Sequence, residues 1–102
     1  MQKTWCLTIR IKKYDEYGGK RLGKILIDFF IGAKISGAIV WTGIDGFGER
    51  RRSSVHLEGI TINMPMMIEV IDEKTKLESL LPQIRRMVGD NGLVTLHEVN
   101  VI

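Results

Sequence analysis

The chain has 102 residues, of which 44% are hydrophobic and 26% charged, with a formal net charge of +3 and a pI near 9.2. This is the composition of an ordinary globular protein, and the mild basic charge suits an anionic ligand but excludes a histone-like nucleic-acid binder. A chain of this length buries only a thin core, so we expect one domain over residues 1–102 that gains stability from an oligomer.

The cysteine content and the hydropathy pattern bear on the cellular compartment. A single cysteine, Cys6, excludes an internal disulfide and fits a reducing environment. The most apolar stretch, residues 25–31, is interrupted by Asp28 and is far too short to span a bilayer. The first residues lack the apolar core and the cleavage site of a signal peptide. We therefore expect a soluble cytoplasmic protein.

The first third of the chain predicts a strand followed by a helix. Apolar and polar residues alternate from Trp5 to Lys12, which is the pattern of a strand with one buried face. Residues 14–19 are polar and glycine-rich and predict a loop. From about Lys20 the apolar residues recur at helical spacing, and Ser36-Gly37 is expected to end this helix.

The middle of the chain predicts strands. Residues 38–42 are almost continuously apolar, which is typical of a central strand covered on both faces. Residues 55–62 have a strand-like pattern, and Asn63-Met64-Pro65 breaks it. Residues 66–71 form another apolar strand.

The last third predicts a helix and a final strand. Thr75 and Glu78 have the spacing of a capping box, and Pro82 should kink this helix or mark its true first turn. Residues 89–92 are a turn signal, and residues 93–102 form the last strand. The element order β-α-β, β-α-β predicts an α+β, ferredoxin-like fold: a four-stranded antiparallel sheet with both helices on one face.

One stretch combines glycines with positive charge. The glycines of Gly46-Phe47-Gly48 can adopt positive φ and bring backbone N–H groups close to an anion. They are followed by Glu49 and by three arginines, Arg50, Arg51 and Arg52, whose guanidinium groups match phosphate geometry. The motif alone is weak, because a tight turn followed by a solvated charged loop has the same composition.

Four stretches in this order resemble one family. They are Gly46-Phe47-Gly48, Met64-Pro65, residues 68–73, and Gly92-Leu93-Val94-Thr95 with a Val-x-Val ending at Val101. Over nearly its whole length the chain resembles the PII-like proteins catalogued as domain of unknown function 190, relatives of the PII nitrogen-regulatory proteins. Gly-Phe-Gly is unspecific by itself, whereas the four stretches together are quite specific.

The resemblance implies a non-catalytic homotrimer that binds an adenine nucleotide (AMP, ADP or ATP) in clefts between subunits. In PII proteins a mobile loop that starts at Gly-Phe-Gly signals the nucleotide state to a target protein, commonly a membrane transporter or a metabolic enzyme. Some members of the resembled family occur alongside fluoride-channel proteins, so the resemblance implies a membrane transporter or channel as a candidate target. Gly46, Phe47 and Gly48 correspond to its root, and residues 49–54 to its start. A second PII loop, Gly-Asp-Gly-Lys, embraces the phosphates and corresponds to Gly89, Asp90, Asn91 and Gly92, followed by Leu93.

The chain departs from the PII pattern at two phosphate contacts. Leu93 stands where PII proteins have a lysine, and the arginines that follow their last strand have no counterpart before Ile102. A hydrogen bond to a charged group contributes about 1.5–3 kcal/mol, so these losses would weaken triphosphate binding unless Arg50–Arg52 compensate. AMP or ADP is therefore at least as good a candidate as ATP.

Two other functions remain as alternatives. Ferredoxin-like sheets also bind single-stranded RNA, but this requires exposed aromatic residues on the middle strands, and only Trp5 and Trp41 could stack. A small trimeric enzyme or metal-handling protein is disfavoured because neither His56 nor His97 has another ligand at metal-binding spacing. We therefore expect no catalytic residues, no metal and no nucleic-acid partner.

Overall fold

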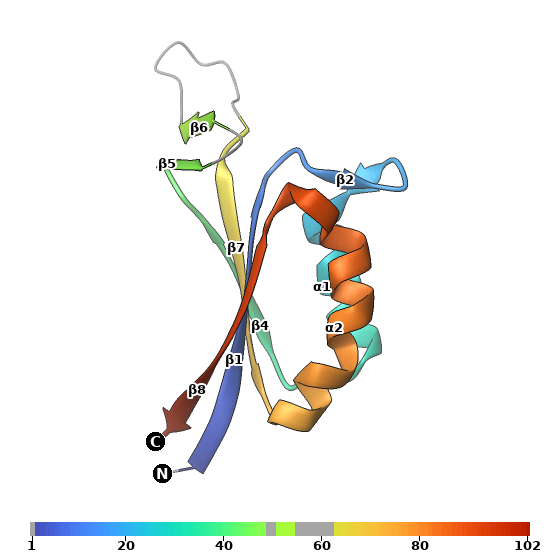
Figure 1. Cartoon of the computed structure of the whole chain (residues 1–102), viewed down its shortest axis with the longest axis vertical. Helices are drawn as coiled ribbons and strands as arrows, with labels where there is room; N and C mark the ends of the chain where they lie inside the picture. The colour runs from blue at the N-terminus through green and yellow to red at the C-terminus, as the bar shows by residue number, and fades with distance from the viewer. Residues whose placement is uncertain (1, 49–50, 55–62) are drawn as a thin grey trace.

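The computed structural model describes residues 2–48, 51–54 and 63–102. Along them the elements are β1 (Gln2–Lys12), β2 (Glu16–Tyr17), β3 (Lys20–Arg21), α1 (Leu22–Gly32), β4 (Ala38–Thr42), β5 (Asp45–Gly48), β6 (Arg51–Ser54), β7 (Pro65–Asp72), α2 (Lys74–Val88), the short 3-10 helix η1 (Gly89–Asn91) and β8 (Leu93–Val101) (Figure 1). The strand expected over residues 55–62 lies outside the described residues.

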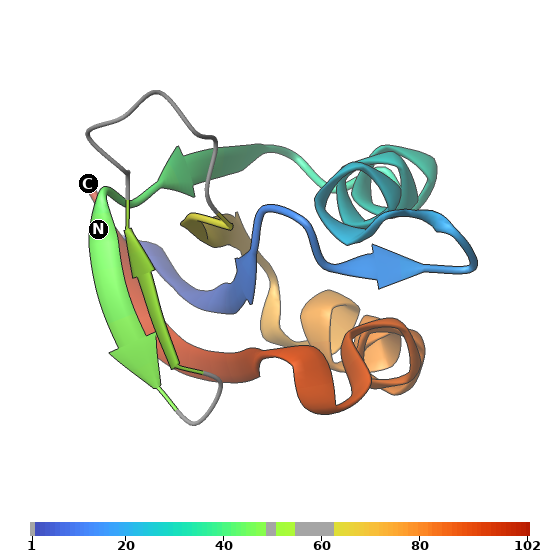
Figure 2. The same cartoon turned by 90° about the horizontal axis from the view of Figure 1, so that it is seen from above.

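Strands β4, β7, β1 and β8 form one antiparallel sheet in that order. Helices α1 and α2 both cover the same face of this sheet and leave the other face open (Figures 1 and 2). This is the ferredoxin-like arrangement, and the predicted fold class is confirmed.

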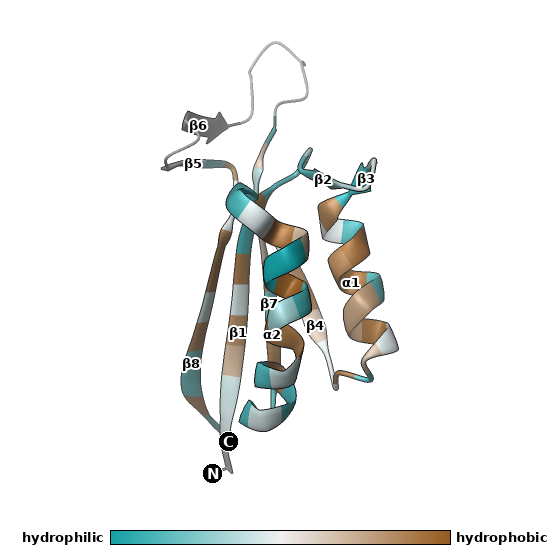
Figure 3. Ribbon diagram, turned by 45° about the vertical axis from the view of Figure 1, so that its right-hand side comes forward, coloured by the Kyte–Doolittle hydropathy of each residue, from teal (hydrophilic) through white to brown (hydrophobic). Residues whose placement is uncertain are grey.

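The core lies between the sheet and the two helices. Alternate residues of β1 point toward the helices and pack against apolar side chains of α1 and α2. Figure 3 shows hydrophobic residues, in brown, along β1 and along both helices. Fully burying one such side chain contributes about 1.5–3 kcal/mol. The largest fully buried side chains are Leu7, Ile9, Leu22, Leu26, Phe30, Ile68, Val70, Leu77, Ile84 and Val88.

Strand β4 differs from the prediction. Its continuous apolar sequence predicted a central strand, but β4 is an edge strand whose five residues are all exposed. Ile39 and Trp41 point to the open face of the sheet and are 53% and 52% exposed. The described part of the chain therefore leaves the apolar side chains of β4 largely exposed.

The end of α1 also differs from the prediction. The helix ends at Gly32, before Ser36-Gly37, and Lys34 takes the left-handed conformation with φ 59°. The N–H of Lys34 donates to the carbonyl of Ile31, and the N–H of Ile35 donates to that of Phe30. This hydrogen-bond pair is a Schellman motif, whose left-handed position is usually occupied by glycine. Because lysine occupies it here, no glycine marks the true end of the helix in the sequence.

The start of α2 corrects a third expectation. The helix begins at Lys74, and its N-cap residue is Glu73. No side-chain hydrogen bond caps this end, so the prediction that Thr75 and Glu78 form a capping box is wrong. Pro82 lies inside the helix and does not mark its first turn. The loop expected over residues 14–19 in part forms the small β2–β3 hairpin.

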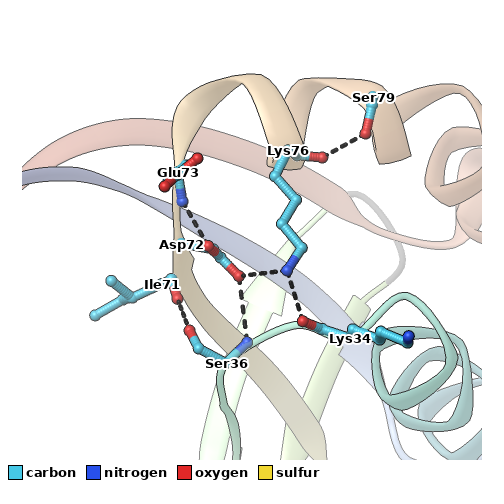
Figure 4. Close-up of polar contacts among 7 residues, drawn as sticks. All are labelled: Lys34, Ser36, Ile71, Asp72, Glu73, Lys76 and Ser79. Atoms are coloured by element: carbon cyan, nitrogen blue, oxygen red, sulfur yellow. Dashed lines mark hydrogen bonds and ion pairs between the residues drawn. The ribbon is translucent and has the colours of Figure 1, made fainter.

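The carboxylate of Asp72 joins the β7–α2 junction to the α1–β4 loop (Figure 4). Its Oδ1 accepts the N–H of Glu73 at 2.8 Å, and its Oδ2 accepts the N–H of Ser36 at 3.2 Å and lies 3.4 Å from Lys76 Nζ. Lys76 Nζ also donates to the carbonyl of Lys34. Burial by itself would raise the pKa of Asp72, but the hydrogen bonds and the Lys76 charge outweigh it and hold the pKa below its ordinary value.

We expect Asp72→Asn to lower the free energy of unfolding by about 1–3 kcal/mol at pH 7, because the ionised carboxylate accepts several charge-assisted hydrogen bonds. A lowered folded-state pKa contributes stability that is present above the unfolded pKa of about 3.9 and is lost as the pH falls through the folded value. Urea unfolding of both proteins at pH 7 and at successively lower pH would measure this, and the two curves should converge in acid.

Asp28→Asn is the matched control, because Asp28 makes an exposed ion pair with Lys24 at 3.3 Å on the surface of α1. Such pairs contribute less than about 1 kcal/mol. Equal losses in the two variants at pH 7 would contradict the role given to Asp72.

Candidate functional site

The first of two glycine-containing connections, here called glycine corners, includes Gly43 and Gly46 and joins β4 to β5. It is fixed to the sheet. The N–H of Gly43 donates to the carbonyl of Pro65 at 2.8 Å, which continues the β4–β7 pairing by one residue. A Cβ at Gly43 would lie 2.8 Å from Pro65 Cγ, and one at Gly46 would lie 3.6 Å from the same atom. A side chain at position 43 would therefore have to displace the proline ring, whereas one at position 46 would make an ordinary contact with it.

The Gly-Phe-Gly stretch is a strand and does not form the expected glycine turn. Gly46 and Phe47 pair with Ser53 and Arg52 in the β5–β6 hairpin, and Gly46 does not have positive φ. The anion-binding backbone N–H groups expected at Gly46 are therefore wrong, because an extended backbone points successive N–H groups to opposite sides. Phe47 is 91% exposed.

The charged residues that follow are only partly described. Glu49 and Arg50 lie outside the described residues, and so does His56. Arg51 and Arg52 belong to β6, but only their backbone is described. Their contact with a phosphate stays a prediction.

The second glycine corner connects α2 to β8. Gly89 has φ 54°, and its N–H donates to the carbonyl of Arg85, which closes the helix. Gly89, Asp90 and Asn91 form η1. Gly92 is extended, but a Cβ there would overlap the carbonyl oxygen of Arg10 and would lie 2.8 Å from Ile11 Cγ2. Positive φ favours glycine at position 89, and close backbone packing requires it at 92.

A cleft of about 890 Å³ lies between the C-terminal half of α2 and the start of β8. Of the residues expected at the phosphate loop, Gly89, Asp90 and Gly92 line it, whereas Asn91 and Leu93 do not. The other lining residues include an apolar group, Leu81, Pro82, Val94 and Leu96, and two arginines, Arg85 and Arg86. Sequence reasoning missed both arginines, although they stand three and four residues before Gly89.

The two glycine corners do not meet within one chain. Both lie at the same end of the sheet, but β5 follows edge strand β4 and η1 precedes the opposite edge strand, β8 (Figure 1). Three interstrand spacings separate these edges, a distance of about 14 Å. The residues expected around one nucleotide thus form two separate groups in the described chain.

The two central strands carry mixed rather than aromatic side chains on the open face of the sheet, where Trp41 of edge strand β4 also lies. On the two central strands, Cys6, Thr8 and Arg10 of β1 lie opposite Ile71, Glu69 and Met67 of β7, and no aromatic side chain occurs among these six positions. Burial raises the pKa of the Cys6 thiol, a hydrogen bond with Thr8 lowers it, and the charge of Glu69 raises it further, with a net increase. Cys6 is free and buried, and it acts as a packing group.

His97 lies beside Cys6 on the open face and is exposed. Within residues 2–48, 51–54 and 63–102, no three or more His, Cys, Asp or Glu side chains are placed to hold a metal ion. No helix in these ranges is long and apolar enough to span a membrane. The cytoplasmic location expected from the sequence stays a prediction.

The sequence between residues 4 and 101 matches the model of the DUF190 family, described as uncharacterized ACR, COG1993. The chain belongs to this family. This DUF190 chain is also similar to two UPF0166 proteins. One, from Methanocaldococcus jannaschii, is 28% identical over 101 residues, which are 99% of this chain and 94% of the relative. The other, from Aquifex aeolicus, is 31% identical over 98% of this chain and 94% of the relative.

The DUF190 chain has the fold of PII-like proteins. Its structure matches that of CPII, a nitrogen regulatory PII-like protein from Thiomonas intermedia K12 bound to ADP, AMP and bicarbonate. The TM-score is 0.76 at 17% sequence identity, and the match covers 98% of this chain and 89% of CPII. The expected membership of a PII-like family and the expected fold are both confirmed.

Proposed function

We propose that this chain is a single PII-like domain, residues 1–102, with a regulatory and non-catalytic function, and that its effector is an adenine nucleotide (AMP, ADP or ATP). The cleft beside Gly89–Gly92 carries this proposal. It offers an apolar surface for a flat ring, two arginines for an anion and a volume of about 890 Å³, within the usual range of small-molecule sites. CPII, which shares the fold, is bound to ADP and AMP.

The site is proposed to be completed by a neighbouring copy in a homotrimer. The open face exposes apolar side chains on three strands, among them Ile39, Trp41, Ile71 and Leu93, which is unusual for a monomer. Covering this face with other copies would bury them. Because the two glycine corners stand at opposite edges of one sheet, the corner at β5 of one copy can approach the corner at η1 of the next.

The β5–β6 hairpin is proposed to signal the nucleotide state to a target protein, such as a membrane transporter or channel. The contact between Gly43 and Pro65 holds the start of the hairpin against the sheet. A ligand that binds beside Gly43 and moves this contact would therefore shift the hairpin as a unit. Phe47 and Ile44 are exposed apolar side chains on the hairpin and just before it, and both are available to a partner.

Isothermal titration calorimetry with AMP, ADP, ATP and single-stranded RNA tests the effector, and light scattering after gel filtration tests the trimer. We expect at least one adenylate to bind at one site per chain, and RNA not to bind at physiological salt. RNA binding that weakens steeply with salt, with no response to any adenylate, would overturn the proposal. Sustained ATP hydrolysis would contradict the non-catalytic function.

A further inference from the structure

We propose that Arg85 and Arg86 bind the phosphate of this nucleotide and supply the charge that Leu93 does not. The inference rests on the proposed function and identifies residues that it leaves unnamed. Both arginines belong to the last turn of α2, and both line the cleft that Gly89 and Gly92 border.

The two guanidinium groups are available to an anion. Arg86 Nη1 donates to the neutral Gln83 Oε1 at 2.7 Å, and no carboxylate of the described ranges forms an ion pair with either arginine. Glu78, which also lines the cleft, has Lys74 Nζ at 4.0 Å. The pair can therefore approach a phosphate without breaking an existing ion pair.

The local charge balance favours an anion despite three opposing groups. The C-terminus of a helix carries roughly half a negative charge, and the lining contains the carboxylates of Asp90 and Glu78. Lys74 Nζ, 4.0 Å from Glu78, offsets that carboxylate, and the two arginines outweigh the helix terminus and Asp90. Arginines in a last helical turn also stabilise the helix through its dipole, so a purely structural role must be distinguished by experiment.

Other residues of the cleft lining are suited to the base. Leu81 and Pro82 of α2 line the cleft, as do Val94 and Leu96 of β8, and together they form an apolar surface. An apolar lining that also contains two arginines matches a flat ring that carries a phosphate. It matches adenosine less well, since adenosine leaves the arginines without a partner.

The test compares AMP with adenosine, by calorimetry, in the wild type and in the Arg85→Ala/Arg86→Ala variant. Loss of charge-assisted hydrogen bonds should weaken AMP binding about ten- to a hundredfold and leave adenosine binding within about twofold. The Arg85→Lys/Arg86→Lys variant keeps the charge and the dipole interaction, so it should fold like the wild type and lose a smaller part of the AMP affinity. The control Lys20→Ala/Lys24→Ala removes two charges on the α1 side and should bind AMP normally.

Three results would overturn the inference. AMP affinity that is unchanged in the alanine variant would leave the arginines with the dipole role alone, while the proposed function would stand. Equal losses for AMP and adenosine would indicate a structural effect on the cleft. A wild-type protein that binds no adenylate at millimolar concentration would overturn the proposed function and this inference together.

Discussion

Replacing Gly92 with alanine is expected to lower the free energy of unfolding by about 3 kcal/mol or more, because the added Cβ overlaps the Arg10 carbonyl oxygen and crowds Ile11 Cγ2. Backbone atoms cannot turn aside as a flexible side chain can. The start of β8 would have to separate from β1 and disturb the mouth of the cleft. Thermal unfolding measures this, and the midpoint should fall by about 12 °C or more for a chain of this size.

Gly32→Ala provides the matched control. Gly32 ends α1, and a Cβ there has nothing within 4 Å. Alanine is favoured over glycine in helices, so the same substitution should leave stability unchanged or raise it by up to about 1 kcal/mol. A Gly92→Ala protein as stable as the wild type would show that β8 can shift freely, and the close packing would then not explain this glycine.

Replacing Ile71 with aspartate is expected to convert the proposed trimer into monomers and to abolish nucleotide binding. Ile71 lies on β7, opposite Cys6 on the open face, and is 38% exposed in the single chain. Burying a carboxylate there without a partner would cost at least about 3 kcal/mol per chain, which weakens association more than a hundredfold at each subunit interface. Sedimentation or light scattering at micromolar concentration would report the mass.

The control for this substitution is Ile31→Asp. Ile31 is 69% exposed on α1, on the helical side of the molecule, where the proposed assembly needs no contact. That variant should keep the mass and the nucleotide affinity of the wild type. A monomeric wild type would remove the basis for this expectation, and so would an Ile71→Asp trimer that still binds nucleotide.

The structure gives a reason for glycine at position 92 that does not depend on a nucleotide. The resemblance to PII proteins assigned it to a phosphate loop, whereas the structure explains it by the approach of the β1 backbone. Weaker nucleotide binding by Gly92→Ala would therefore not identify a phosphate contact. The arginine substitutions in α2 are the sharper test, because their side chains face the cleft and do not support the β1–β8 pairing.

The arginines themselves were missed because helical periodicity describes which residues face the core and says little about the others. Arg85 and Arg86 lie off the apolar face of α2, where charged residues are usually solvated. Only the position of β8 relative to α2 makes them part of a concave surface that also contains Gly89 and Gly92.

The sequence by itself determined the order of the two helices and of the four strands of the main sheet, but not the two small hairpins, since the period of the apolar residues depends on neighbours a few positions apart. The alternation in β1 and the helical spacing in α1 and α2 were sufficient for the ferredoxin-like fold. The tertiary structure alone decided that β4 is an edge strand, that the two glycine corners stand at opposite edges, and that a cleft unites Arg85 with Gly92. These features depend on which distant strands pair and on how α2 packs beside β8, and no local pattern in the chain encodes such long-range contacts.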